Sequence, residues 1–360
     1  MTAQELNTYI DKVLGNSLRC LLPSYWWKRI LTLIVGYVES VDGRVTTVNT
    51  SLSDVTIDVS KVINIIKKTS YVTITTSSEG SAKVYADGKA IDIPAGETVK
   101  VFCGDSFHAI SPTDGGSSDN LETILSIDTS MMKTCWYTSM ERMFMWCEKV
   151  SSLDVSNFDT SNVKDMSRMF EGCMSLTSLD VSNFDTSNVT NIYGMFYRCW
   201  SLTSLDVSNF DTSNVKYMDS MFEDCKSLTS LDVSNFDTSE VTDMGRMFSY
   251  CDSLTSLDVS SFDTSKVTDI VSMFKNCSNI AKLSLGEGFF KTRQGTEIDF
   301  SDLGKWEESS FIQSIVTNSY DRTANGLPNI TINLHANTYA YLTDEHKASL
   351  TAKGYNVASV

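Results

Sequence analysis

The stretch Leu179-Asp180-Val181-Ser182-Asn183-Phe184-Asp185-Thr186-Ser187 decides the fold, because the chain repeats it almost letter for letter. From Val150 to Leu285 the phrase returns with a period of 26 residues. Two sets of side chains keep that step, namely Cys147, Cys173, Cys199, Cys225, Cys251 and Cys277, and Phe158, Phe184, Phe210, Phe236 and Phe262. A fixed period of this length predicts a solenoid, in which each unit buries its apolar face against its neighbours. Solenoids present long exposed faces, which favours binding over catalysis.

Each copy divides into two apolar patterns. Leu179 and Val181 alternate with polar residues, which predicts a short strand with both side chains turned inward. The apolar steps that follow are typical of one or two helical turns, at Val189, Ile192, Met195, Phe196 and Cys199. Asp185 precedes this stretch, where a short polar side chain can cap helical amides. Strand, cap, short helix and return together predict one leucine-rich-repeat-like coil.

The phrase resembles the repeat of the BspA-like leucine-rich repeat family. The matching residues are Leu153-Asp154-Val155-Ser156-Asn157-Phe158-Asp159-Thr160-Ser161-Asn162-Val163, then Met169-Phe170 and Cys173. Four further copies follow, and a degenerate copy begins near Ile127. The resemblance covers about half of the chain. It implies surface-exposed adhesion or recognition modules, and it implies no catalytic residues.

Charge and cysteine content limit the classes of partner. The chain has 45 acidic against 29 basic residues, which argues against a nucleic-acid binder with a basic face. Six of its nine cysteines occupy one equivalent position beside apolar side chains. We expect these six to form a buried column of reduced thiols rather than disulfides. No CxxC pair or Cys/His cluster indicates a metal site.

The N-terminal third carries a second regularity. Apolar residues recur in alternating steps of four and three at Ile34, Val38, Val41, Val45, Val48, Leu52, Val55, Val59, Val62 and Ile66. This is a heptad pattern, and β-branched residues at both core positions favour three strands over two. Residues 31–69 are therefore predicted to form a homotrimeric coiled-coil stalk with those side chains as its core. The competing interpretation is a pair of β-strands, because Val and Thr favour strands and Gly43 weakens a helix.

Residues 1–30 precede the stalk as an N-terminal anchoring segment with a predicted helical face. The sequence from Asp11 to Arg29 resembles the N-terminal leader of structural proteins in phages of gut Bacteroidetes. This resemblance implies attachment to other virion proteins, with Trp26, Trp27, Lys28 and Arg29 as candidate anchors. The alternative is that the two tryptophans cap the core of the coil. No secretory signal and no membrane-spanning run is visible, so we expect release with a particle and no membrane insertion.

The remaining segments complete an α+β multidomain chain. Residues 70–115 predict a small β-module, in which Asp87-Gly88 marks a hairpin. Residues 116–290 form the predicted solenoid. Residues 291–360 predict a capping unit with a strand near Ile330, a helix from Thr343 and a final strand from Tyr355. That unit is also a candidate for the tip that touches a receptor.

No chemistry-bearing motif is evident. The three histidines lie in different segments, and no nucleophile elbow, phosphate-binding loop or HExxH motif occurs. The repeated Asp180 and Asp185 suggest either a structural ladder of turn hydrogen bonds, which we favour, or calcium sites. We expect no enzyme activity, no cofactor and no metal. A depolymerase that cleaves polysaccharide is a distant alternative.

Residues that break the repeat are the candidates for recognition. Aromatic and arginine side chains are typical of interface hot spots. The candidate contacts are Tyr193, Tyr197, Arg198, Trp200, Arg168, Tyr217 and Tyr250. The leading hypothesis is a homotrimeric tail or head fibre on a phage virion that binds a glycan or protein of the host surface. The alternative is a BspA-like adhesin on a bacterial cell surface.

Overall fold

The computed structural model describes residues 70–103, 106–108, 123–292, 297–303 and 309–360. The chain separates into two compact units, Met1–Ser70 and Tyr71–Val360. The predicted anchoring segment, with Trp26, Trp27, Lys28 and Arg29, lies outside the described residues. So do the predicted stalk and its ten core positions from Ile34 to Ile66. The described residues therefore test neither the anchoring segment nor the stalk, and both stay predictions.

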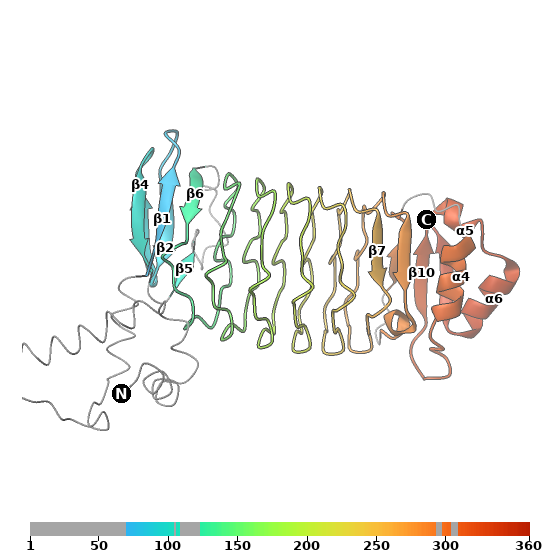
Figure 1. Ribbon diagram of the computed structural model, residues 1–360. Helices are drawn as coiled ribbons and strands as arrows, with labels where there is room; N and C mark the ends of the chain where they lie inside the picture. The colour runs from blue at the N-terminus through green and yellow to red at the C-terminus, as the bar shows by residue number, and fades with distance from the viewer. Residues whose placement is uncertain (1–69, 104–105, 109–122, 293–296, 304–308) are drawn as a thin grey trace, which may run out of the picture. The chain divides into compact units, whose positions relative to one another are not determined.

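The described part of the second unit is a mixed α+β arrangement built from several small sheets. Three sheets have three strands and one has two strands. The helices described are α4 (Ser309–Asn318), α5 (Ala336–Tyr339) and α6 (Asp344–Ala352), with a 3-10 turn η4 (Glu287–Phe290). Figure 1 shows the repeat copies side by side in chain order between the first strands and these helices.

Five of the six strands in the first two sheets lie in the predicted β-module, residues 70–115, and the sixth, Ile124–Asp128, lies in the range predicted as the solenoid. One sheet is antiparallel with the order β4-β1-β6, formed by β1 (Tyr71–Thr76), β4 (Thr98–Phe102) and β6 (Ile124–Asp128). The other has the order β3-β2-β5, formed by β2 (Ala82–Ala86), β3 (Lys89–Ile93) and β5 (Phe107–His108). The predicted hairpin is confirmed, since Asp87 and Gly88 join β2 to β3 with φ of 50° and 72°. Positive φ at both residues is what a tight two-residue hairpin requires.

Strand β6 joins the β-module to the repeats. Ile127 of β6 stands 26 residues before Leu153, so β6 occupies the strand position of the degenerate first copy. It pairs with β1 on one side, and the Thr129 hydroxyl donates to the Asp154 carbonyl of the next copy. The first repeat therefore has a partner at its edge instead of a bare apolar layer.

The predicted inward alternation of each copy is confirmed. Leu179 and Val181 are buried while Asp180 between them is exposed, and the other copies follow the same pattern. After β6 in the degenerate first copy, regular strands return in the last two copies, as the parallel pair β7 (Ser256–Val259) and β8 (Lys282–Leu285). In the earlier copies these segments alternate in the same way without regular strand assignment.

The predicted short helix is wrong. The segment from Val189 to Cys199 forms consecutive turns, in which the Met195 amide donates to the Ile192 carbonyl at 3.1 Å. The next amide, of Phe196, donates instead to Met221 of the following copy at 3.0 Å. An α-helix would send every amide back four residues. Here every second amide donates to a carbonyl of the next copy. Isolated parallel bridges, from Ser139↔Asp165 to Asp243↔Asp269, also link the copies.

The interior of the copies is a stack of aligned rings and thiols. The rings of Phe170, Phe196 and Phe222 lie 5.7 and 5.8 Å apart between centroids and are nearly parallel. Beside them Cys199 donates its Sγ–H to the Phe170 carbonyl at 3.3 Å. All six column cysteines are buried and carry free thiols, which confirms the predicted column.

The repeated aspartates hold turns rather than a helix. Asp185 Oδ1 accepts hydrogen bonds from the Ser187 amide at 3.0 Å and its hydroxyl at 2.6 Å. Asp180 Oδ1 accepts from the Ser182 amide at 3.0 Å. These bonds to a residue two positions on are Asx turns, which supports the structural-ladder interpretation.

A parallel sheet and helices follow the last copy. The sheet order is β11-β10-β9, from β9 (Ile298–Phe300), β10 (Ile330–Leu334) and β11 (Tyr355–Ser359). Thr343 caps α6 by accepting from the His346 amide at 3.1 Å, as its position predicts. The Phe300 ring lies 5.8 Å from that of Phe274, so this sheet continues the aromatic stack of the last copy.

Candidate recognition site

The consecutive turns place two residues of each copy in the left-handed region of φ. One such position holds Arg168 and Gly194, and the other holds Gly172 and Arg198, all with φ between 57° and 74°. This conformation costs a residue other than glycine about 1 kcal/mol. At all four of these positions the amide donates to a carbonyl of the next copy, at 2.7 to 3.0 Å. The turns thereby hold outward side chains on a fixed backbone.

Arg168 and Tyr193, from neighbouring copies, form the first part of the site. The Arg168 guanidinium donates to the Tyr193 hydroxyl at 2.8 Å, and its Cζ lies 4.7 Å from the centroid of that ring. Its Nε lies 3.3 Å from the Glu171 carboxylate. Although burial opposes the charge, the Tyr193 hydrogen bond and Glu171 raise the pKa of Arg168. Arg168 therefore remains a cation fixed between a ring and a carboxylate.

Glu171 lies beneath this surface and is 5% exposed. Loss of water raises the pKa of this carboxyl, and the charges of Arg168, Arg142 and Arg198 oppose that rise. Arg168 forms the ion pair with Glu171, and Arg142 and Arg198 act on this carboxyl as nearby positive charges.

Arg198 forms the second part of the site with two aromatic rings. Its Cζ lies 5.5 Å from the Trp146 ring centroid and 5.0 Å from that of Tyr197. Contacts of this kind contribute about 0.5–1 kcal/mol each where they are exposed. Gly172 makes room for the indole, since a Cβ atom there would lie 2.2 Å from it. The Trp146 indole therefore extends past the copy that contains Gly172 and contacts Arg198 in the copy beyond it.

Asp224 connects Arg198 to the third part of the site. Its carboxylate oxygens lie 3.5 Å from Arg198 Nε and 3.4 Å from Lys226 Nζ. Lys226 Nζ in turn lies 4.7 Å from the centroid of the Trp200 ring. Trp200 is 36% exposed, so much of its indole is open to a partner. We call the set Trp146, Arg168, Tyr193, Tyr197, Arg198, Trp200, Asp224 and Lys226 the arginine–aromatic cluster.

The cluster brings together five of the seven residues predicted as contacts, Arg168, Tyr193, Tyr197, Arg198 and Trp200. Tyr217 is 48% exposed at a bridge between copies, where it pairs with Asn191 and Asp243. Tyr250 is 36% exposed with φ of 58°. Neither has a ring or cation contact with the cluster in the part of the chain that the structure describes. Tyr217 lies in the same copy as Asp224 and Lys226, and Tyr250 lies in the copy that follows.

Sequence reasoning missed three members of the cluster, Trp146, Asp224 and Lys226, and also Gly172, which makes room for Trp146. Trp146, Gly172 and Asp224 occupy the position of Arg198 in their own copies, at multiples of 26 residues. Comparing that single position across copies gives Trp146, Gly172, Arg198, Asp224 and Tyr250. The residue type at this position differs in every copy, whereas the core positions around it are constant. This contrast in the sequence could have identified these residues.

The arrangement is suited to binding. It offers rings and cations that are already fixed by hydrogen bonds and carboxylates, which lowers the entropy cost of holding a ligand. The six column thiols lie in the core, and burial raises the pKa of Cys173 to about 12. Within the described ranges, no group of three or more His, Cys, Asp or Glu side chains is arranged to hold a metal ion. In the same ranges, no helix has the length and apolar character to cross a membrane.

The repeat region is similar in sequence to a known protein family. Residues 138–231 and 202–287 match the family described as "Mycoplasma protein of unknown function, DUF285". These ranges coincide with the repeats, and the match supports their resemblance to BspA-like repeats. No curated protein and no solved structure matches the chain.

Proposed function

We propose that this protein binds a ligand on a bacterial surface through the arginine–aromatic cluster. The observation that carries the proposal is the junction of Arg198 with Trp146, Tyr197 and Asp224, drawn from three copies. A repeat needs identical inward residues, whereas these outward residues differ from copy to copy. Aromatic and arginine side chains of this kind dominate binding energy at interfaces.

The wider proposal is a homotrimeric appendage of a phage virion. The stacked copies act as a leucine-rich-repeat-like solenoid, supported by their bridges at a spacing of 26 residues. Residues 31–69 act as the trimeric coiled coil, supported by the unbroken heptads. Residues 1–30 attach the trimer to other virion proteins. Three copies of the cluster on one particle add avidity to a weak site.

A bacterial surface adhesin is the second candidate. The family match to DUF285 favours it, because that family is described from Mycoplasma, a cellular organism. Both candidates use the cluster in the same way and differ in what carries the chain. Immunogold labelling of virions and of cells with an antibody to the repeats separates them. Label on virions supports the appendage, and label confined to cells supports the adhesin.

Attachment to cells tests the cluster itself. The Tyr197→Ala, Trp200→Ala double variant of the full chain is expected to lose most of its binding to bacteria that the unaltered chain binds. Hot-spot aromatic residues contribute about 2 kcal/mol or more each, so the loss of even one weakens binding about 30-fold. Tyr341→Ala is the matched control, since Tyr341 is an exposed aromatic residue outside the repeats. Equal binding of both variants and the unaltered chain contradicts the proposal.

A further inference from the structure

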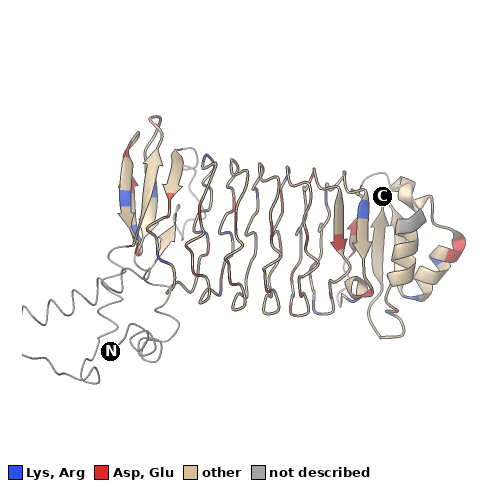
Figure 2. Ribbon diagram, viewed as in Figure 1, with Lys and Arg blue, Asp and Glu red and all other residues tan. Residues whose placement is uncertain are grey.

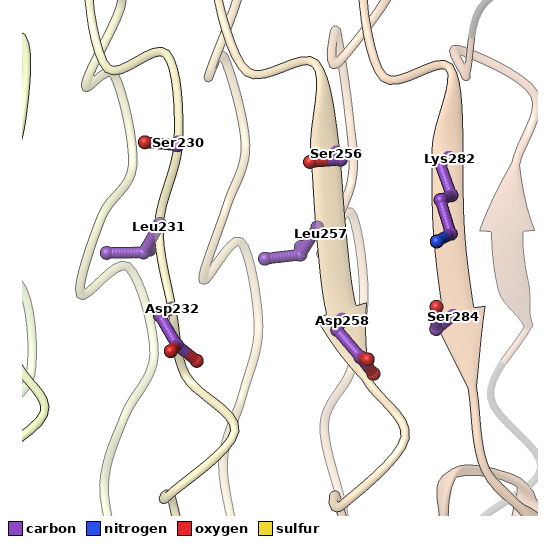
Figure 3. A pocket seen from close by; sticks show the side chains of 8 residues that line it. All are labelled: Ser230, Leu231, Asp232, Ser256, Leu257, Asp258, Lys282 and Ser284. Atoms are coloured by element: carbon purple, nitrogen blue, oxygen red, sulfur yellow. The ribbon is translucent and has the colours of Figure 1, made fainter.

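A groove lies over the strand positions of the last three copies, apart from the arginine–aromatic cluster. Its volume is about 300 Å³, and it is lined by Ser230, Leu231, Asp232, Ser256, Leu257, Asp258, Lys282 and Ser284. Figure 3 shows these side chains on three adjacent segments, the second and third being β7 and β8. This volume is at the lower limit of about 300–1,000 Å³ for small-molecule sites.

Polar rows border the groove. Ser230 and Ser256 form one row, and Asp232 and Asp258 form the other, two residues further along each segment. Because alternate residues of a strand share a face, both rows point outward. Leu231 and Leu257 lie between the rows and are 7% and 3% exposed. A ligand in the groove meets hydroxyls and carboxylates at its edges and has an apolar strip close by.

The last of the three segments breaks the repeat at both polar positions. Lys282 stands where the other copies have serine, and Ser284 stands where they have aspartate. Lys282 is exposed, and it has no ion pair among the residues that the structure describes. Figure 2 shows the basic segment of β8 next to an acidic segment of β7. The groove therefore has acceptors along one part and a single strong donor at its end.

The two carboxylates retain capacity to accept hydrogen bonds. Asp232 and Asp258 each accept a backbone amide hydrogen bond through Oδ1, from Ser234 and Ser260 at 3.0 and 2.9 Å. An ionised carboxylate has about four acceptor sites, so most remain available. The bonds with Ser234 also lower the pKa of Asp232, so this acceptor stays ionised in mild acid.

The balance of charge selects the class of ligand. Two carboxylates and one ammonium give the groove a small net negative charge, which disfavours an anionic ligand. Lys282 at the end disfavours a cationic group beside it. A ligand with many hydroxyls satisfies both parts, since its O–H groups donate to the aspartates and its oxygens accept from Lys282.

We propose that this groove binds an uncharged sugar unit of a glycan, as a second site distinct from the arginine–aromatic cluster. Sugar hydroxyls donate to Asp232 and Asp258 and accept from Lys282 and the serines. Leu231 and Leu257, which are nearly buried between the two rows, lie at the floor of the groove. The site ends at Lys282 and Ser284, where the residues differ from the serine and aspartate of the other copies.

Methyl NMR of the full chain tests the site directly. The probes are maltoheptaose, xylohexaose and mannohexaose as neutral glycans, with trigalacturonate and a glucosamine trimer as charged counterparts. We expect saturable shifts of the Leu231 and Leu257 methyl signals with a neutral oligosaccharide at millimolar concentration. The same signals of Leu179 and Leu205, at equivalent positions outside the groove, should stay unchanged. Added salt should leave the affinity unchanged, since no ion pair forms.

Variants separate recognition from folding. Lys282→Ser restores the residue of the other copies, and Asp258→Asn removes one charge. Each is expected to weaken binding about 10- to 100-fold, as expected for a lost hydrogen bond to a charged group. Asp206→Asn makes the same change in a copy outside the groove and should bind as the unaltered chain does.

Three results would overturn the proposal. The first is the absence of groove shifts with every neutral oligosaccharide. The second is saturation by the charged probes alone, with binding that weakens in salt. The third is equal weakening by Asp206→Asn and Asp258→Asn. None of these results depends on the arginine–aromatic cluster, so cell attachment through that cluster is a separate question.

Discussion

The indole of Trp146 lies against the Cα of Gly172, so closely that a Cβ atom there would stand 2.2 Å from Cε3 of the ring. Gly172 also has φ of 74°. Two requirements therefore meet at one glycine, a left-handed backbone and space for an aromatic ring. The contact matters for the site because Trp146 reaches the Arg198 guanidinium from this position.

Replacing Gly172 with alanine should destabilise the fold more than the same change at Gly194. Gly194 has φ of 57°, but the nearest atom to an added Cβ is 3.5 Å away. Gly194→Ala should therefore cost only the left-handed backbone, about 1 kcal/mol. Gly172→Ala adds the displacement of Trp146, for a total of about 2–4 kcal/mol. Urea unfolding followed by circular dichroism measures both. Equal losses would show that the indole has no steric role.

The positions of the buried residues could be predicted from the period of the repeat. Leu179, Val181 and Cys199 are buried where the pattern placed them, because a strict repeat allows one inward set of residues. The helix could not be excluded in the same way. Apolar residues at Ile192 and Met195 fit a helix and a pair of turns equally well. The choice depends on amides such as that of Phe196, whose acceptor lies in the next copy.

The site was predictable in part for a similar reason. Tyr197, Arg198 and Trp200 stand out because they are large residues in variable positions of a regular copy. Trp146 lies in the degenerate first copy, so only a comparison of its single position with Arg198 and the other copies points to it. Gly172 acts through the side chain it lacks, and only the three-dimensional contact with Trp146 shows its importance.

The column cysteines should resist thiol reagents in the folded protein. Burial raises the pKa of Cys173 and Cys225 to about 12, so the reactive thiolate is absent at pH 8. Treatment with a maleimide at pH 8, with and without urea, followed by peptide mapping, measures each cysteine separately. We expect labelling of the six column positions only in urea. Labelling of Cys199 in the native state would contradict its burial.

Asp219 should make the fold less stable as pH rises from about 4 to 7. Burial, followed by the charges of Asp243 and Asp269, raises the pKa of Asp219 to about 7. The folded state therefore holds a proton that the unfolded state has released above pH 4, and this stabilisation is lost as pH rises towards 7. Asp219→Asn should be more stable than the unaltered chain at pH 8, by about 1–2 kcal/mol after allowance for solvent screening.

The pH profile of unfolding in urea distinguishes Asp219 from other aspartates. Asp219→Asn should flatten the decline in stability between about pH 4 and 7. Asp180→Asn is the control, because bonds with Ser182 lower the pKa of Asp180 and it titrates below that window. A profile of Asp219→Asn with an unchanged slope would show that Asp219 does not carry the buried proton.

The predicted stalk gives the last test, which concerns assembly. If residues 31–69 form a trimeric coil, an acidic residue at core position Val48 places three like charges at its centre. Val48→Asp in the full chain should therefore sediment as a monomer under conditions where the unaltered chain sediments as a trimer. Thr46→Asp introduces the same charge between core positions and should leave the trimer intact. Sedimentation velocity of all three proteins measures this. A monomeric unaltered chain, or trimers in both variants, would remove the coiled coil from the proposal and leave the arginine–aromatic cluster to act singly.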